Sequence, residues 1–127
     1  PEPTTAEVIP NHVARYWDLM ALSDRQPARV IGANGKLRDR PGFDVDFLSR
    51  NSIPDTPYTL TKHEVLMPMR GHWRLTWSEG STVLNPGDTA AIPPGLEHVL
   101  APSMTGEASL YRVVATDDPA GLTGRLL

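Results

Sequence analysis

The chain has 127 residues, of which 39% are hydrophobic and 21% charged, and its formal net charge is −3. This length and composition fit one soluble globular domain that can bury a hydrophobic core. The absence of cysteine excludes disulfide bonds, thiolate metal ligands and a cysteine nucleophile, and fits a reducing cytoplasm as the expected location. Lys and Arg are scattered and no apolar run could cross a bilayer, so neither nucleic acid nor a membrane is an expected partner.

The first segment predicts an arm and a helix. Residues 1–10 are polar and rich in proline, which is typical of a flexible or draped arm. Asn11 has the residue type of a helix N-cap, and Val13, Tyr16 or Trp17, and Met20 then recur at helical spacing. We therefore expect an amphipathic helix over His12–Leu22 that packs on the outside of a sheet, with docking of a partner domain as the alternative.

The remaining sequence predicts short strands separated by turns, punctuated by many of the 13 prolines and 10 glycines of the chain. The expected strands are Ala28–Gly32, Phe43–Leu48, Tyr58–Met69, His72–Trp77, Thr82–Leu84, Ala90–Ile92, His98–Leu100 and Ala108–Ala115. Within Phe43–Leu48, hydrophobic residues alternate with Asp44 and Asp46, which predicts a half-exposed strand with solvated carboxylates. So many short antiparallel strands indicate an all-β sandwich or barrel.

The most informative motif lies near residue 90, where Gly87, Pro93, Gly95 and His98 stand at fixed offsets. Glycine tolerates the positive φ of tight turns, and proline fixes φ, so the segment predicts a turn, a short strand and a second turn before His98. These four residues match the second motif of the cupin superfamily, which the chain resembles. Pro102 replaces the asparagine with which that motif ends. The resemblance implies a double-stranded β-helix, a jelly-roll barrel.

The division of the chain follows from this resemblance. We expect an N-terminal arm and helix over residues 1–27, a cupin barrel over residues 28–116 and a C-terminal tail over residues 117–127. Cupins commonly pair through their outer sheets or exchange N-terminal segments, so the resemblance also implies a homodimer.

The first cupin motif is only half present, because Glu64 and Gly71 match its second part but both metal-binding histidines are missing. Tyr58 and Leu60 stand in the histidine positions with a three-residue gap before Glu64, and Pro57 and Thr59 with a four-residue gap. Cupin enzymes generally hold a divalent metal with three histidines and a glutamate, so the resemblance leaves Glu64 and His98 as implied metal ligands. A third ligand would have to be Tyr58, or His63 if a bulge turned it inward.

Other candidate site residues come from strand alternation. Tyr58, Lys62 and Glu64 share one parity and should face the barrel interior together, where Lys62 would either repel a cation or pair with Glu64. Trp73 and Trp77 share a face with Leu75, which favours core packing and leaves pocket lining as the alternative. If Arg112 faces inward, its guanidinium could anchor a ligand carboxylate.

Two functions from different classes follow. The leading hypothesis is a degenerate cupin domain that binds a small organic ligand, anionic or aromatic, through Tyr58, Lys62, Glu64, Trp73, Trp77, His98 and Arg112, without a complete metal centre. The alternative is a metal-dependent cupin enzyme of the dioxygenase, isomerase or cyclase type, with iron, manganese, nickel or zinc on Glu64 and His98. Metal-free acid/base chemistry by Glu64, Lys62 or His98 lies between the two.

Overall fold

The computed structural model describes residues 13–37 and 42–116 of the chain. Its elements are the helix α2 (Tyr16–Leu22) and the strands β1 (Ala28–Ile31), β2 (Phe43–Ser49), β3 (Glu64–Arg70), β4 (Trp73–Trp77), β5 (Gly80–Leu84), β6 (Ala90–Ile92), β7 (His98–Pro102) and β8 (Ser109–Ala115). They form one five-stranded sheet, ordered β1-β2-β8-β3-β6, and one three-stranded sheet, ordered β5-β4-β7. The described helix is too short to cross a membrane.

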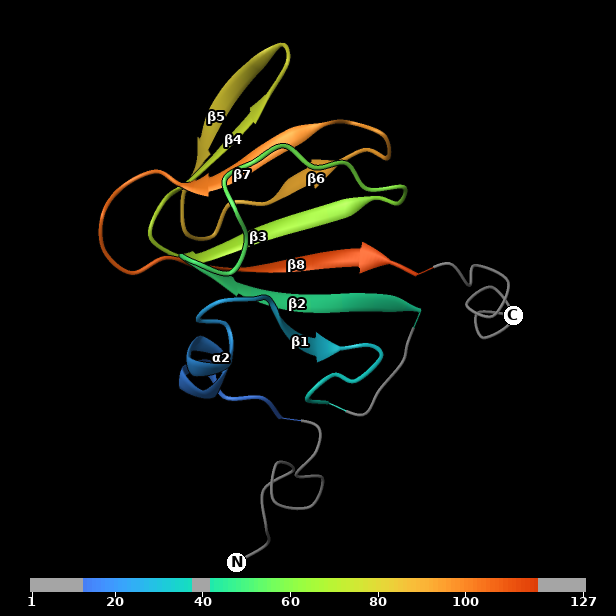
Figure 1. Cartoon of the computed structure of the whole chain (residues 1–127), viewed down its shortest axis with the longest axis vertical. Coiled ribbons are helices and arrows are strands. Elements are labelled where there is room, and N and C mark those ends of the chain that lie inside the picture. The colour runs from blue at the N-terminus through green and yellow to red at the C-terminus, as the bar shows by residue number, and fades with distance from the viewer. Residues whose placement is uncertain (1–12, 38–41, 117–127) are drawn as a thin grey trace, which may run out of the picture.

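The two sheets face one another around a hydrophobic core. Figure 1 shows the β4–β5 hairpin at one end of the molecule and α2 beside β1 and β2 at the other. Strands of both sheets contribute to the buried cluster between them, which contains Leu48, Leu66, Trp73, Leu75, Leu84, Ile92, Leu100, Ala108 and Leu110. The predicted all-β jelly-roll architecture is therefore confirmed.

A second core lies on the outer face of the larger sheet. Leu19 of α2 is fully buried against Ala28 and Val30 of β1 and Phe47 of β2. The expected helix is present but begins at Tyr16, with Arg15 as its N-cap and no side-chain cap. The predicted cap at Asn11 lies outside the described residues.

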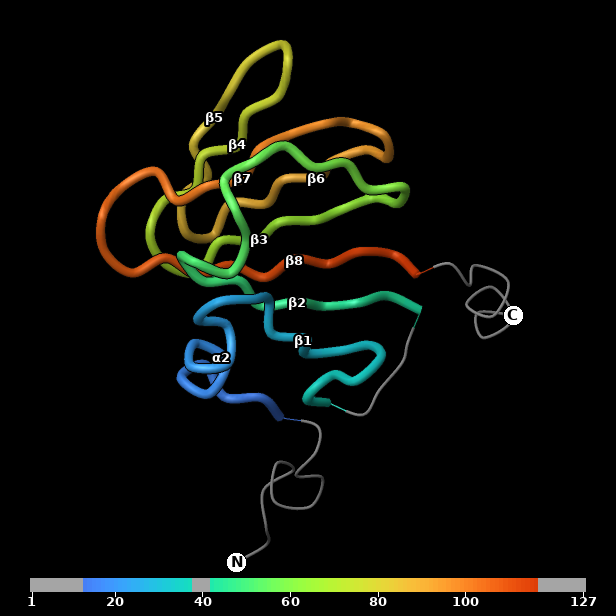
Figure 2. The backbone as a smooth tube through the Cα atoms, viewed as in Figure 1, coloured from blue at the N-terminus to red at the C-terminus, as the bar shows by residue number. Residues whose placement is uncertain are grey.

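Two predictions about strands were wrong. The expected strand Tyr58–Met69 is interrupted, because the chain bends at residues 61 and 62 and β3 begins only at Glu64. Tyr58 instead forms an isolated bridge with His98, through a pair of backbone hydrogen bonds of 2.9 and 3.0 Å. Figure 2 shows this part of the chain leaving β2 and passing beside β7 before it turns back into β3.

The second wrong prediction concerns Asp46, which is buried rather than solvated, with 5% of its surface exposed. Strand β2 is covered on both faces, since Phe47 packs beneath α2 while Leu48, of the opposite parity, belongs to the core between the sheets. Asp46 shares the inner face with Leu48, and its carboxylate is therefore inside the barrel. Asp44, two residues earlier on that face, is partly exposed.

Candidate functional site

A buried polar cluster occupies one end of the barrel interior, where four separate segments place their side chains together. Glu64 begins β3, His98 begins β7, and Arg112 lies in β8 beside Leu66 of β3. Tyr58 reaches the cluster through its backbone bridge to His98. Glu64 and His98, the two residues that the motifs implied as metal ligands, are therefore in direct contact.

The carboxylate of Glu64 is the centre of the cluster and has no exposed surface. Its Oε2 accepts a hydrogen bond from the Tyr58 hydroxyl at 2.7 Å, and its Oε1 lies 2.7 Å from Nε2 of His98. The Arg112 guanidinium lies 3.9 Å from Oε2. A buried carboxylate is tolerated only when its charge and lone pairs are matched in this way.

Both ring nitrogens of His98 have a hydrogen-bond partner within the protein. Its Nδ1 is 2.8 Å from the carbonyl oxygen of Leu96, which can only accept, so Nδ1 carries a hydrogen. The 2.7 Å contact between Nε2 and Glu64 then needs one more proton, either on the imidazole or on the carboxyl group. The two ring nitrogens of His98 are thus both engaged, one by the Leu96 carbonyl and the other by the Glu64 carboxyl group. Gly95, with φ at 83°, forms the turn that brings the Leu96 carbonyl to this position.

A row of charges continues from this pair across the larger sheet. Arg29 of β1, Asp46 of β2 and Arg112 of β8 are direct register partners, so their side chains lie side by side on one face. Nε of Arg29 is 2.5 Å from one Asp46 oxygen, and Nη2 of Arg112 is 3.2 Å from the other. The sequence analysis did not predict that Arg29 and Asp46 pair. The only signal for this pairing in the sequence is that they carry opposite charges in two neighbouring expected strands.

The environment of Tyr58 shifts its acidity. Burial raises the pKa of the Tyr58 hydroxyl above its ordinary value, and the nearby Glu64 carboxylate raises it further, while Arg112 opposes the rise. Tyr58 therefore acts as a hydrogen-bond donor and not as a phenolate. Its ring also lies 4.3 Å from the His98 ring, centre to centre.

These residues do not fit the metal centre of a cupin enzyme. Nε2 of His98 and both oxygens of Glu64 are already engaged within the protein, and the Arg112 cation stands where a second cation would be repelled. Among the described residues, no group of three His, Cys, Asp or Glu side chains is close enough to hold a metal ion. His63, the proposed substitute ligand, is exposed.

The remaining predicted site residues are dispersed. Trp73 is fully buried in the core and its Nε1 donates to the Ser109 carbonyl, which favours the core-packing alternative. Trp77 is partly buried and packs against the same core. Lys62 lies on the bend before β3 and not in a strand, so its predicted alternation with Glu64 was wrong. Arg112 faces inward, as its proposed anchoring role requires.

A small cavity lies near the start of β3, and none of the four residues of the polar cluster lines it. It has a volume of about 260 Å³ and is lined by Asp44, Leu60, Thr61, Lys62, Val114, Ala115 and Thr116. Val114 is the register partner of both Asp44 and Glu64, so the cavity lies one step along the sheet from the Glu64–His98 pair. We call it the mouth cavity, because it lies where β2 and β3 begin and β8 ends.

Comparison with solved structures identifies the fold. A cupin-2 domain protein of Shewanella frigidimarina superposes with a TM-score of 0.63 at 15% identity, covering 82% of this chain and 95% of that one. A cupin 2 conserved barrel protein of Salinispora arenicola gives a TM-score of 0.62 at 15% identity, covering 81% and 86%. A Neisseria meningitidis protein gives 0.56 at 18% identity, covering 91% and 100%.

These likenesses establish the cupin fold, which the motif around His98 predicted. No protein-family model and no curated protein matches the chain. At sequence identities this low, the similarity shows that the chain has the same architecture as these proteins and does not show that it shares their activity.

Proposed function

We propose that this chain is a cupin-fold domain that binds a small organic ligand at the mouth of the barrel and works without a metal centre. The observation that carries the proposal is the closed hydrogen-bond cluster of Tyr58, Glu64 and His98. In this cluster Glu64 and His98, the two residues that the cupin motifs imply as metal ligands, bond to one another, and the Arg112 cation lies beside Glu64. The residues that would be ligands hold the barrel together instead.

The mouth cavity supports the binding part of the proposal. Its lining combines the Lys62 cation and the Asp44 carboxylate with the hydroxyls of Thr61 and Thr116, over an apolar wall that includes Val114. Sites for small molecules typically combine an apolar surface with a few polar groups that fix orientation. At about 260 Å³ the cavity suits a small molecule, and the Lys62 ammonium is the lining group that would contact an anion.

Metal content and ligand binding are tested separately. Protein purified without chelator should contain iron, manganese, nickel and zinc well below one equivalent, and His98→Asn should leave that content unchanged. One equivalent of metal in the wild type that is lost in His98→Asn would overturn the metal-free proposal and support the metal-dependent enzyme.

For ligand binding, thermal unfolding is measured with succinate and with benzoate as probes. A ligand that binds the native state raises the unfolding temperature with concentration. Lys62→Ala should reduce this rise, whereas Lys36→Ala is the matched control, because Lys36 lines a different cavity beside β1. Equal rises in all three proteins, or none, would refute binding of such anions at the mouth cavity.

A further inference from the structure

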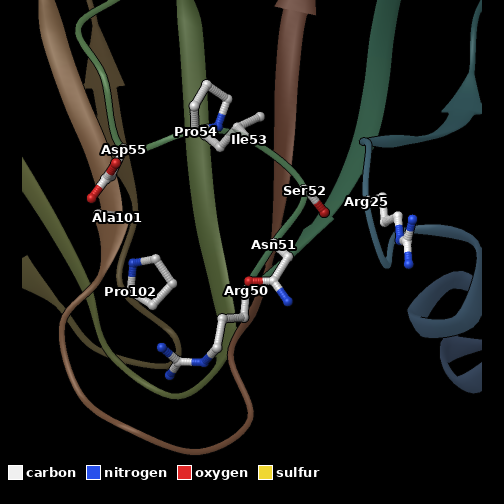
Figure 3. Close-up of a pocket in the computed structure, with 9 residues that line it drawn as sticks. All are labelled: Arg25, Arg50, Asn51, Ser52, Ile53, Pro54, Asp55, Ala101 and Pro102. Carbon is white, nitrogen blue, oxygen red and sulfur yellow. The ribbon is translucent and has the colours of Figure 1, made fainter.

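The segment that joins β2 to β3 runs along the edge of the smaller sheet, of which β7 is the outermost strand on that side. The chain passes Pro54 and reaches Asp55, which lies near Ala101 of β7 (Figure 3). It then forms the isolated bridge between Tyr58 and His98 and continues to the start of β3. We call residues 53–63 the strap.

Both ends of the strap are fixed to the barrel. Before the strap, the hydroxyl of the buried Ser52 donates to the carbonyl oxygen of Ser23 at 2.7 Å and accepts from the Ser49 backbone N–H at 2.6 Å. After the strap, the fully buried Glu64 begins β3 between β8 and β6. Any movement of the strap is therefore that of a loop with two anchored ends.

Between these ends the strap is held by few contacts. None of its residues is buried, and most are exposed. Within the described ranges, three backbone hydrogen bonds connect it to the rest of the barrel. Two form the bridge between Tyr58 and His98, and one runs from the Gly95 N–H to the Leu60 carbonyl oxygen at 2.9 Å. Exposed segments with few hydrogen bonds open locally at a lower free energy than the core of a domain does.

Cavities border both halves of the strap. Its first half, with Ile53, Pro54 and Asp55, lines a cavity of about 580 Å³ whose wall also includes Pro102 of β7. Its second half, residues 60–62, lines the mouth cavity of about 260 Å³. The strap is therefore not packed tightly along its whole length, and it can move without compressing the close-packed core.

Two side chains of the strap hold it closed, since Ile53 and Tyr58 pack against the core between the sheets. The Tyr58 hydroxyl donates to Glu64 at 2.7 Å, and the Tyr58 ring lies 4.3 Å from the His98 ring, centre to centre. Tyr58 thus contacts both members of the Glu64–His98 pair, whose side chains are only 1% exposed. Movement of Tyr58 away from the pair would expose it.

We propose that the strap is a lid that opens as one unit and admits solutes to the Glu64–His98 pair. Pro54 and Pro57 fix φ at two positions, so the strap bends little between its anchors and carries Tyr58 with it. The mouth cavity loses one wall in the open state, because residues 60–62 belong to the strap. Opening is a property of the chain alone and needs no ligand in the mouth cavity.

Native-state hydrogen exchange, followed by NMR on the full chain, tests whether the strap opens as one unit. The amides of Tyr58, Gly95 and His98 should share one opening free energy, lower than that of the amides of β8. Tyr58→Phe should speed exchange at Gly95 and His98 about 10-fold, because it removes a hydrogen bond to a carboxylate. The matched control is Tyr111→Phe, which alters a half-buried tyrosine on the outer face of β8 and should leave these rates unchanged.

Labelling with diethyl pyrocarbonate tests whether opening exposes the pair. His98 should react far more slowly than the exposed His63, and Tyr58→Phe should speed the reaction of His98 about 10-fold without changing that of His63.

A disulfide that holds the strap closed completes the test, since the chain has no cysteine of its own. The register of the bridge places Thr59 opposite Glu97 as a non-hydrogen-bonded pair, a geometry within reach of a disulfide, and both residues are exposed. In the double variant Thr59→Cys with Glu97→Cys, oxidation should slow labelling of His98 at least 10-fold, and reduction should restore it. Equal labelling of the oxidised and reduced forms, or an opening free energy of the strap equal to that of β8, would overturn the proposal.

Discussion

Replacing Glu64 tests the buried cluster most directly. In Glu64→Ala the Tyr58 hydroxyl and Nε2 of His98 both lose the acceptor that lies at 2.7 Å, and Arg112 loses a neighbouring carboxylate. Breaking a buried ion pair by removing one partner costs about 3–5 kcal/mol. Domains of this size have unfolding free energies of about 5–15 kcal/mol, so roughly a fifth or more of the stability should be lost.

Urea unfolding followed by circular dichroism measures this loss. With a slope of roughly 2 kcal/mol per molar urea, the unfolding midpoint should fall by roughly 2 M. Glu64→Gln should lose only about 1–2 kcal/mol, because its amide can accept from Tyr58 and donate to a neutral His98. Glu79→Ala, in the exposed turn between β4 and β5, is the control and should change little.

A double-mutant cycle decides whether the pair itself carries the effect. The double variant Glu64→Ala with His98→Ala should lose clearly less stability than the sum of the two single variants, because removal of both groups leaves neither unpaired. Additivity within about 0.5 kcal/mol, or a loss in Glu64→Ala no greater than in Glu79→Ala, would show that the two side chains are not coupled as the structure describes.

Three further predictions concern other parts of the fold. Because the pKa of Tyr58 is raised in the native state, its contribution to stability is complete below pH ~10 and falls above that pH. In urea titrations above pH ~10, Tyr58→Phe should therefore lose stability less steeply with pH than the wild type does. Identical slopes in the two proteins would contradict this reasoning. Asp46→Asn should cost about 3 kcal/mol or more, and the partly exposed Asp44→Asn less than about 1 kcal/mol, in the same titrations. Gly71→Ala should lower the thermal midpoint more than Gly87→Ala does: both have positive φ, but only at Gly71 would the Cβ meet a backbone oxygen, that of Glu107, at 2.5 Å. Equal losses at the two glycines would contradict that reasoning.

The sequence alone determined the architecture and the centre of the site. Glycines and proline at the offsets of the motif around His98 impose turns that depend only on local backbone geometry, and both Gly87 and Gly95 adopt the positive φ expected of them. Short alternating segments gave β2, β6, β7 and β8 within a few residues of their bounds. The same motifs selected Glu64 and His98, which the fold brings into contact.

Only the tertiary structure decided how the polar groups are matched. Alternation in β2 separates Asp46 from Phe47, but it does not show that α2 covers one face and the barrel the other, so burial of the carboxylate depends on packing between distant segments. Tyr58 meets Glu64 because the chain crosses to β7 and returns, and not because the two residues share a strand. Arg29, Asp46 and Arg112 are far apart in sequence and become neighbours only through strand register, since cross-strand pairing joins residues that local sequence cannot relate.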